Sequence, residues 1–535
     1  MASSSRRLRA FKRWMKSHGV ECSDSLELAD DLPGGQGIAV KALCDLKEGD
    51  VVARIPKAAC LTIKTSGAHQ MIESAGFDGY LGLSVALMYE KSLGPQSLWD
   101  GYLQLLPRQE CLPLLWTLAE LDTLLLGTEI HKIVKQDKDL IYEDWEESIL
   151  PLVDSLPSQL NPNFFGVEQY LSAKSLIASR SFEIDDYHGF GMVPLADLFN
   201  HKNGAEDVHF TSTSYHCEFD ADSNNYNNVN DEPSTSNGQL MKKRMEEGSI
   251  DVCATIGDDE ESAENSFLDN IESPIDPDGR SSSSGDDSKS SPDIEDDQTV
   301  LEMIMVKNVK AGAEVFNAYG LLGNAALLHR YGFTEPNNLY DIVNIDLELV
   351  LEWSSSLFSG RYSRTRLSFW RRLGYSGCVS QDSEYFEISY EGEPQIELLI
   401  LLYIMLLAED TYYKLDLTVS TTQNYNGAIG MLLSEKSNIA SKKASEMSKE
   451  LLLTVSVCNA LVCLADMRES FYGSNSLEDD LEALRSCVRD RKLYHSLVLR
   501  VSERRILEKM RTYAAVGMRP YTPDTVSREE EIETE

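Results

Sequence analysis

The stretch VPLADLFNHKNG, residues 193–204, carries an apolar run that ends on two polar side chains. Asp197 is the only charge between Val193 and Phe199, and Asn200 and His201 follow directly. Both of these side chains can donate and accept hydrogen bonds, and such groups need partners when they are buried. A second apolar run with a polar ending, EVFNAYG (314–320), follows after more than a hundred residues of largely polar sequence. We therefore ask what the two endings bind.

The bulk composition describes a globular protein with an acidic surface. The chain has 535 residues, 42% of them hydrophobic and 25% charged, which leaves room for two or three domains. Its net charge of -38 argues against nucleic acid or an anionic membrane as the main partner, because both attract clustered Lys and Arg. The longest apolar run, IELLILLYIMLLA (396–408), is too short to span a bilayer and is typical of a buried helix. We expect neither a nucleic-acid nor a membrane partner.

Cysteine usage and the N-terminus bear on the compartment. The ten cysteines occur singly, with no C-x-x-C pattern, which indicates free thiols in a reducing compartment and predicts no metal site. The basic start MASSSRRLRAFKRWM resembles a transit peptide. However, Phe11, Trp14, Met15 and His18 recur at helical spacing, so we expect the folded part to begin near residue 10. This favours the cytosol or nucleus, with a plastid as the alternative.

Hydrophobic periodicity divides the chain into regions. Residues 1–20 predict an N-terminal helix, 35–64 predict strands with a turn, and about 66–175 have helical spacing before strand-like sequence returns near 190–210. From 321 to 520 the chain is mainly helical, including one long helix expected at about 436–467. The last residues, 521–535, form an acidic tail.

Residues 218–297 have a different composition from the rest of the chain. They contain 23 acidic and 5 basic side chains and few apolar ones. Such a segment buries too little surface to offset its ordering entropy, so we predict that it is disordered. Strand-like sequence flanks it on both sides, which indicates an insertion within one domain. It is either a solvated insert or a docking segment for a basic partner.

Four short stretches contain the residues that could carry chemistry. They are GGQGIAV (34–40), SRSF (179–182), VPLADLFNH (193–201) and VFNAYGLLGNAALLHRYGF (315–333). Each stretch is weak evidence of a functional site when taken singly, because a Gly-x-Gly can be a tight turn and an Asn-His can end a strand. Only their order and spacing together are informative.

Taken together, the four stretches resemble the SET-domain methyltransferases, in particular the Rubisco large-subunit methyltransferase branch. WDGYLQLLP (99–107) and LLWTLAELDTLLLGT (114–128) resemble the helical insert of that branch, and LRVSERRIL (499–507) resembles its C-terminal domain. The resemblance implies an α+β fold: a SET-domain β core with a pseudoknot at 21–320, interrupted by the helical insert at about 66–175. An all-α substrate-binding domain at 321–520 would follow.

The resemblance also implies a cofactor, S-adenosylmethionine. Asn200 and His201 would hydrogen-bond its adenine through side chain and backbone. The methionine end would lie against Gly34, Gly35 and Gln36, where the lack of side chains permits close backbone approach. In a pseudoknot of this kind the Asn-His and Tyr-Gly strands meet around that pocket, which would answer the opening question.

The resemblance places the remaining site residues around the substrate channel. Tyr319 would be the catalytic residue, with its phenol oxygen near the methyl group, and would contribute to the cofactor site. Arg180 would pair with a carboxylate or hold the cofactor end of the channel, and Asp197 would contact the substrate or the channel mouth. The aromatic walls of the channel would be Phe182, Phe210 and Tyr331.

Departures from the family pattern refine the expected substrate. No Cys-rich zinc motif follows the Tyr-Gly stretch, which fits a substrate other than a histone. Phe210 stands where relatives often carry an aromatic hydroxyl, which leaves the channel chemistry and the number of methyl groups open. Ala196, before the acid, resembles the lysine-specific rather than the histidine-specific version.

The resulting hypothesis is a protein-lysine N-methyltransferase that uses S-adenosylmethionine, acts on a non-histone protein and works as a monomer. Rubisco, aldolase, ribosomal proteins and translation factors are the substrates that the resemblance suggests. One alternative is a catalytically inactive SET-fold protein that binds cofactor or partner. Another is a scaffold whose acidic insert is the docking element.

Overall fold

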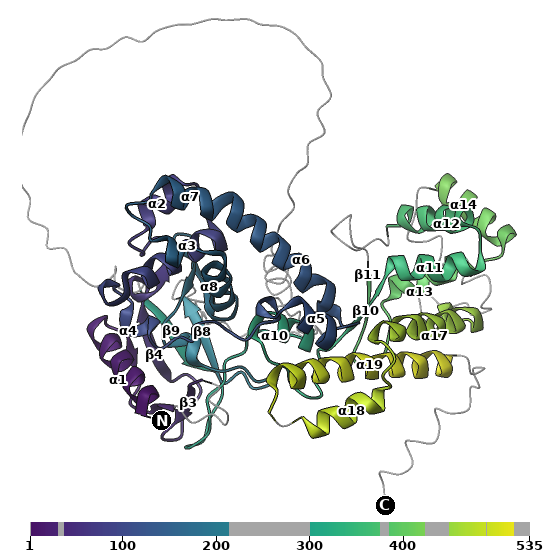
Figure 1. The fold of residues 1–535 in the computed structure, drawn as a ribbon. Helices are drawn as coiled ribbons and strands as arrows, with labels where there is room; N and C mark the ends of the chain where they lie inside the picture. The colour runs from purple at the N-terminus through teal and green to yellow at the C-terminus, as the bar shows by residue number, and fades with distance from the viewer. Residues whose placement is uncertain are drawn as a thin grey trace, which may run out of the picture.

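The structure is a computed structural model that describes residues 2–29, 37–212, 300–374, 385–422, 449–487 and 489–517. The described chain forms two parts that lie side by side (Figure 1). One, formed mainly by the N-terminal half, combines helices with short antiparallel strands, and we call it the α/β part. The other is a helical part formed by the C-terminal half. Several predictions concern residues outside these ranges: Gly34, Gly35 and Gln36, the acidic insert 218–297 and the acidic tail 521–535. The predicted domain boundaries stay predictions.

The described strands of the α/β part are short and form three sheets. They are β1 (Glu21–Cys22), β2 (Leu26–Ala29), β3 (Ala39–Ala42), β4 (Val51–Pro56), β5 (Leu61–Thr62), β6 (Ser181–Asp185), β7 (Gly189–Met192), β8 (Val208–Ser212) and β9 (Val300–Met305). The sheet orders are β1-β4-β9-β8, β5-β7-β6 and β2-β3, and the neighbouring strands pair antiparallel. Side chains along β9 alternate between half-buried and buried, as expected for a strand with one face on the core.

Strands β8 and β9 flank the acidic segment and pair with each other. Val208 lies opposite Met305, and Ser212 lies opposite Leu301. The chain therefore leaves the sheet and re-enters it at the same end of one strand pair. Because the entropy of closing a loop grows only with the logarithm of its length, this pair can hold a long connection at little extra cost.

Helices surround the sheets of the α/β part, and all of them except α5 contribute to one core with the sheets. They are α1 (Ala2–Ser17), α2 (His69–Ser74), α3 (Gly79–Leu93), α4 (Asp100–Leu103), α5 (Leu118–Leu124), α6 (Glu129–Asp144), α7 (Leu150–Ser155) and α8 (Val167–Arg180). Phe11, Trp14 and Met15 on α1 are buried in that core, and the Trp14 indole donates a 2.7 Å hydrogen bond to the Leu98 carbonyl. The N-terminal helix is thus packed as part of the fold.

The second part is mainly helical. Its elements are α10 (Asn324–Tyr331), β10 (Val343–Asp346), α11 (Leu347–Leu357), α12 (Gly360–Arg372), β11 (Tyr385–Ile388), α13 (Ile396–Leu406), α14 (Glu409–Thr422), α16 (Lys449–Leu452), α17 (Val455–Glu469), α18 (Leu477–Ser486) and α19 (Arg491–Gly517). The apolar run predicted to be a buried helix is α13, whose residues Leu398 to Met405 are all buried. None of the helices in the described ranges is both long enough and apolar enough to cross a bilayer.

Two details of the helical part differ from the prediction. The antiparallel pair β10 and β11 adds a two-stranded sheet to a region expected to be all-α, because Val343, Ile345, Phe386 and Ile388 alternate into the core over only four residues each. The expected helix at about 436–467 is divided among the described residues into α16 and α17, because the Thr454 hydroxyl caps α17 by accepting from the N–H of its third residue.

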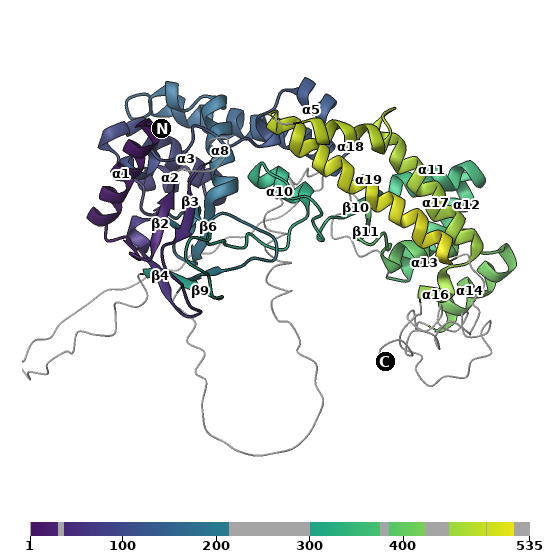
Figure 2. The same cartoon turned by 90° about the horizontal axis from the view of Figure 1, so that it is seen from below.

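Helix α19 joins the two parts. It contacts α17 and α18 of its own part and also α5 of the α/β part, and it extends from the middle of the molecule to the far end (Figure 2). Its 27 residues make it about 40 Å long. A small apolar cluster that includes Trp116, Leu125 and Leu499 covers the junction.

Buried charges at this junction connect the parts further. The Arg468 guanidinium on α17 donates to the Gly127 carbonyl (2.7 Å) and to the Glu129 carboxylate on α6 (2.9 Å). Glu503 on α19 accepts from the Glu129 N–H (3.1 Å) and from the Tyr472 hydroxyl (2.6 Å). These contacts fix the helical part against the insert helices of the α/β part.

Candidate active site

The two polar endings that the sequence analysis singled out are neighbours in the structure. The Asn317 N–H donates a 2.9 Å hydrogen bond to the Asn200 carbonyl, and Asn317 forms parallel bridges with His201 and with Val208. The 193–204 stretch therefore ends directly against the 314–320 stretch.

His201 is the centre of this junction. Its Nδ1 accepts a 3.0 Å hydrogen bond from the Tyr319 main-chain N–H, and its Nε2 lies 3.0 Å from Asn203 Oδ1. Because a main-chain N–H can only donate, Nδ1 is the acceptor, and the ring proton belongs on Nε2. Burial lowers the pKa of His201, although the Asn203 contact opposes this, so the imidazole is neutral near pH 7.

Asn200 connects the junction to the β2-β3 region. Its amide nitrogen donates to the Glu314 carboxylate at 2.8 Å and to the Ile38 carbonyl at 3.4 Å. Glu314 in turn forms an antiparallel bridge with Lys41 on β3. The amide is thus used to hold three chain segments together.

Tyr319 presents a fixed and neutral phenol. Its hydroxyl donates to the Phe199 carbonyl at 2.9 Å. Its ring stacks on His201 at 5.1 Å between centroids and contacts the Tyr331 ring at 4.6 Å. Burial raises the pKa of Tyr319 despite the opposing charge of Arg180, so the phenol stays protonated at physiological pH.

A buried ionic cluster surrounds Arg180, the last residue of α8. The guanidinium donates to Glu110 at 2.7 Å and to Asp197 at 3.3 Å, and the Tyr102 hydroxyl donates to the same Asp197 oxygen at 2.9 Å. Burial acts to lower the pKa of Arg180, but the two carboxylates outweigh it and the pKa is raised. The guanidinium is therefore charged, and it holds both acids in place.

One carboxylate oxygen of Asp197 accepts no hydrogen bond from the described residues. Its side chain is completely buried, and its Oδ1 has no hydrogen-bond partner among the described residues. Burial raises the pKa of this carboxyl, with the Arg180 charge opposing. The turn that carries it begins at Leu195, a non-glycine residue with φ of 78°. Backbone strain of this kind costs about 1–3 kcal/mol and is found preferentially at functional sites.

Phe182 and Phe210 form a separate aromatic pair. Their ring centroids are 4.9 Å apart with an interplanar angle of 38°. Phe182 follows Arg180 by two residues at the start of β6, and Phe210 lies on β8. Both are partly buried against the main core.

Comparison with known proteins identifies relatives among lysine methyltransferases. No family model matches the chain. Ribosomal lysine N-methyltransferase 3 of Saccharomyces cerevisiae is 25% identical over 370 residues, which cover 63% of each protein. N-lysine methyltransferase setd6 of Danio rerio is 24% identical over 366 residues, covering 64% of this chain and 60% of the relative. The chain thus spans less than two thirds of the length of these relatives.

Solved structures match over nearly the whole chain. The SET domain of LSMT bound to lysine and AdoHcy superposes with a TM-score of 0.58 at 17% identity, covering 96% of this chain and 91% of that one. Rubisco LSMT bound to AdoMet gives a TM-score of 0.56, covering 95% and 92%. The chain has the SET fold of Rubisco LSMT. The predicted α+β fold and the predicted resemblance to this branch are confirmed.

The LSMT-like fold brings several predicted site residues together. Asn200, His201, Tyr319 and Tyr331 form one contact group, and the charges of Arg180 and Asp197 act on the Tyr319 hydroxyl. The side chains of Asn200 and His201 satisfy internal partners, so their predicted contacts with adenine stay a prediction. So do the roles of Phe182 and Phe210, which form the second group, and of Gly34, Gly35 and Gln36, which lie outside the described residues.

Four residues of the candidate site were not predicted. They are Tyr102, Glu110, Asn203 and Glu314, which hold Asp197, Arg180, His201 and Asn200, respectively. Tyr102 lies in WDGYLQLLP, a stretch noted only for its family resemblance. Asn203 could have been noticed, because an amide two residues after a turn histidine is placed to bond with it. Nothing in the local sequence marks Glu110 or Glu314.

Proposed function

We propose that the chain is an S-adenosylmethionine-dependent protein-lysine N-methyltransferase that acts on a protein other than a histone. The observation that carries this proposal is the neutral Tyr319 phenol, held by the Phe199 carbonyl and influenced by the charges of the partly buried Arg180 and the buried Asp197. The relatives are named as lysine methyltransferases, and the LSMT structures are described with lysine, AdoMet or AdoHcy. We also propose that the protein acts in the cytosol or nucleus, with a plastid as the alternative, and as a monomer.

The polar groups near His201 suit the cofactor. Asn203 Nδ2 is buried and has no hydrogen-bond partner in the described part of the chain, and a purine edge offers acceptors that such a donor requires. Asn200 and His201 would hold the adenine side, and Gly34, Gly35 and Gln36 would hold the methionine side. When bound, the cofactor supplies a methyl group carried on a positively charged sulfonium.

Charge around Asp197 suits positively charged reactants. Two carboxylates, Glu110 and Asp197, face a single guanidinium, that of Arg180. The unpartnered Asp197 Oδ1 is an additional acceptor. A site with this surplus of acceptors favours a cation such as an ammonium.

The acceptor lysine must lose a proton before it can react. Its reference pKa is about 10.4, so presenting the neutral amine at pH 7 costs about 4.6 kcal/mol. Burial among aromatic rings lowers the pKa of an amine and reduces this cost. Tyr319 and Tyr331 supply such rings at the junction, and Phe182 and Phe210 would supply more.

Tyr319 orients the amine and does not act as a base. Its proton is committed to the Phe199 carbonyl, so the remaining lone pairs of the phenol oxygen can accept a hydrogen bond from the amine. Because its pKa is raised, the phenolate is not populated near pH 7. Holding the amine in line with the methyl group lowers the barrier by avoiding the entropic cost of bringing the reacting atoms together.

The proposal is tested by methyl transfer. The full chain is incubated with S-adenosylmethionine labelled in its methyl group and with a cell extract, and the products are separated by gel. We expect one or a few labelled protein bands, and mass spectrometry of a band should find methylated lysine. Tyr319→Phe should reduce labelling about 100-fold, whereas Tyr142→Phe, at an exposed tyrosine, should not.

Two outcomes would contradict the proposal. If wild-type protein binds the cofactor in calorimetry but labels nothing in any extract, the chain is an inactive SET-fold binding or scaffold protein. If the label appears on another residue type, the lysine assignment is wrong. Removing residues 218–297 tests the scaffold alternative, because a docking segment would be needed for partner capture but not for methyl transfer.

A further inference from the structure

Helix α12 carries a concentration of positive charge in an acidic protein. Its thirteen residues include five arginines and no acidic residue, whereas the whole chain has 49 basic and 87 acidic residues. Arg366 is buried and donates to the carbonyls of Ile404 and Leu407. The other arginines are exposed: Arg361, Arg364, Arg371 and Arg372, which we name the α12 arginine face.

The spacing places these arginines along one side of the helix. Arg361, Arg364 and Arg371 follow each other at three- or four-residue steps when Ser368 is counted between the last two, so they line one surface of the α-helix. Arg372, four residues after Ser368, lies on the same surface. Phe369 and Trp370 on the other side are buried in the core of the helical part. The backbone of α12 is therefore held by its apolar face, and the arginines project from its exposed side.

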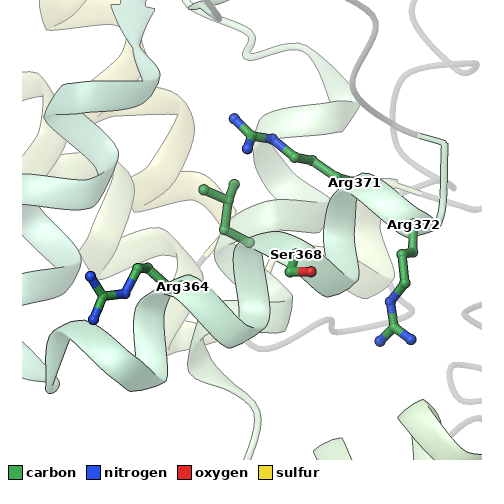
Figure 3. Close-up of a pocket in the computed structure, with 5 residues that line it drawn as sticks. Arg364, Ser368, Arg371 and Arg372 are labelled. Atoms are coloured by element: carbon green, nitrogen blue, oxygen red, sulfur yellow. The ribbon is translucent and has the colours of Figure 1, made fainter. Parts of the chain in front are cut away.

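A hollow lies over this face. Its volume is about 500 Å³, and it is lined by Arg364, Leu367, Ser368, Arg371 and Arg372. Figure 3 shows Arg364 and Arg371 on either side of the Ser368 hydroxyl along the helix, with their guanidinium groups directed away from the helix axis. The hollow thus combines guanidinium groups and a hydroxyl above an apolar floor.

Part of this charge has no counter-charge within the described chain. Arg372 pairs with Asp416 on α14 at 2.5 Å, and both side chains are partly exposed. Among the residues that the structure describes, the side chains of Arg361 and Arg364 have neither a hydrogen bond nor an ion pair. Like charges along one helix face repel each other, so the face is stabilised by any partner that supplies carboxylates.

Helix α12 lies away from the strands of the α/β part. In Figures 1 and 2, α12 lies toward the outer end of the helical part, and β10 and β11 lie between it and the strands of the α/β part. It is therefore no part of the candidate active site. A segment of a partner protein bound here would increase the affinity of the chain for that partner without contacting the reacting atoms.

We propose that the α12 arginine face binds an acidic segment of a partner protein. Guanidinium groups pair with carboxylates through two parallel hydrogen bonds, which a compact ammonium cannot reproduce. From Arg361 to Arg372 the helix rises about 16 Å, which matches about five residues of an extended peptide. If the proposed function holds, that partner is the methylated protein, and the face is a docking site that lowers KM. The binding itself does not depend on the methyl transfer.

The test is a binding measurement with a fluorescein-labelled peptide of ten glutamates and the full chain. Fluorescence anisotropy should detect salt-sensitive binding. Replacing three arginines together, R361E/R364E/R371E, should weaken it about ten-fold or more. The matched control is R6E/R7E/R13E on α1, which makes the same charge change at exposed positions and should change affinity less than about two-fold. A milder set, R361Q/R364Q/R371Q, with circular dichroism on every variant, separates loss of binding from loss of fold.

Several results would overturn the proposal. Equal loss in the α1 control would mean that only overall charge matters. Binding that appears only after residues 218–297 are removed would make the chain's own acidic segment the occupant. Arginine-dependent binding to vesicles of phosphatidylcholine and phosphatidylserine, without peptide binding, would make a membrane surface the ligand. Methyl transfer and cofactor binding are measured separately, so their failure would disprove the proposed function and leave peptide binding intact.

Discussion

The main-chain N–H of Tyr319 donates to Nδ1 of His201, with 3.0 Å between the two nitrogens, although the two residues are 118 positions apart in sequence. This bond has two consequences. It fixes His201 as a neutral imidazole with its proton on Nε2, and it holds the backbone that carries the proposed catalytic phenol. His201, in the Asn-His ending, therefore positions Tyr319. This role is separate from the contact with the cofactor's adenine that we propose for His201.

Two substitutions at His201 should distinguish how much its aromatic ring and its hydrogen bond each contribute to stability. His201→Phe keeps an aromatic ring against Tyr319 but leaves the Tyr319 N–H without its acceptor, and we expect the free energy of unfolding to fall by about 1–3 kcal/mol. His201→Asn, whose oxygen can take the place of Nδ1, should cost less. Urea unfolding measures both. His209→Phe, at an exposed histidine on β8, is the control, and an equal loss there would contradict the role of the bond.

The stability that His495 contributes should fall as the pH is lowered below neutral. Burial, with help from the Arg491 charge, lowers the pKa of His495 to about 4, and its Nδ1 accepts from the Thr334 N–H. Between about pH 6.5 and 4 the unfolded chain binds a proton at this residue and the folded chain does not, so protonation favours unfolding. His201 acts in the same direction. His495→Asn keeps an acceptor but cannot titrate, so its melting temperature should depend less on pH between 7 and 5. Identical pH profiles for the two proteins would contradict this assignment.

The residues that could be predicted from the sequence are those with a local signal. The apolar run at 396–408 is α13, and Phe11, Trp14 and Met15 form the buried face of α1. The Asn-His and Tyr-Gly stretches were recognised by their order, and their contact follows from the fold. Short features without periodicity were missed, such as β10, which is only four residues long.

Side-chain contacts between residues far apart in the sequence could not be predicted. The Tyr102 hydroxyl reaches Asp197 across 95 residues, and Glu110 reaches Arg180 across 70. A tyrosine on one short helix and an acid in a loop carry no local pattern that distinguishes them from surface residues. Only the packing of α4 and α8 around one core brings them to the same carboxylate–guanidinium cluster.

Tyr102 should act as a positioning residue for Asp197. Tyr102→Phe removes one hydrogen bond to the carboxylate, and we expect about 1 kcal/mol of lost stability together with reduced methyl transfer. Tyr170→Phe removes a similar contact, a 3.3 Å hydrogen bond to Asp144, and should cost stability without affecting transfer. If both variants transfer methyl groups equally well, Tyr102 has only a structural role.

Gly127 should tolerate no side chain at the junction of the two parts. A Cβ at this position would lie 2.6 Å from the Phe471 main chain, and the residue has φ of 79°. Gly76 has a similar φ of 71° but open space around it. Alanine at Gly76 should cost about 1 kcal/mol through φ alone, and alanine at Gly127 should cost clearly more because the backbone must also move. Equal melting temperatures for the two variants would show that α17 and its turn are not packed there as described.

Arg468 should be the most sensitive charge between the two parts. Only 7% of its side chain and 11% of that of Glu129 are exposed, so replacing the arginine leaves a buried carboxylate without its counter-charge. Arg468→Met should therefore reduce the free energy of unfolding by about 3–5 kcal/mol. Arg485, which pairs with Glu478 where both are about two-thirds exposed, is the matched control, and Arg485→Met should cost about 1 kcal/mol or less. Urea unfolding followed by circular dichroism measures both. A loss at Arg468 no greater than that at Arg485 would mean that solvent reaches Glu129, and the junction would then be held by its apolar cluster rather than by its charges.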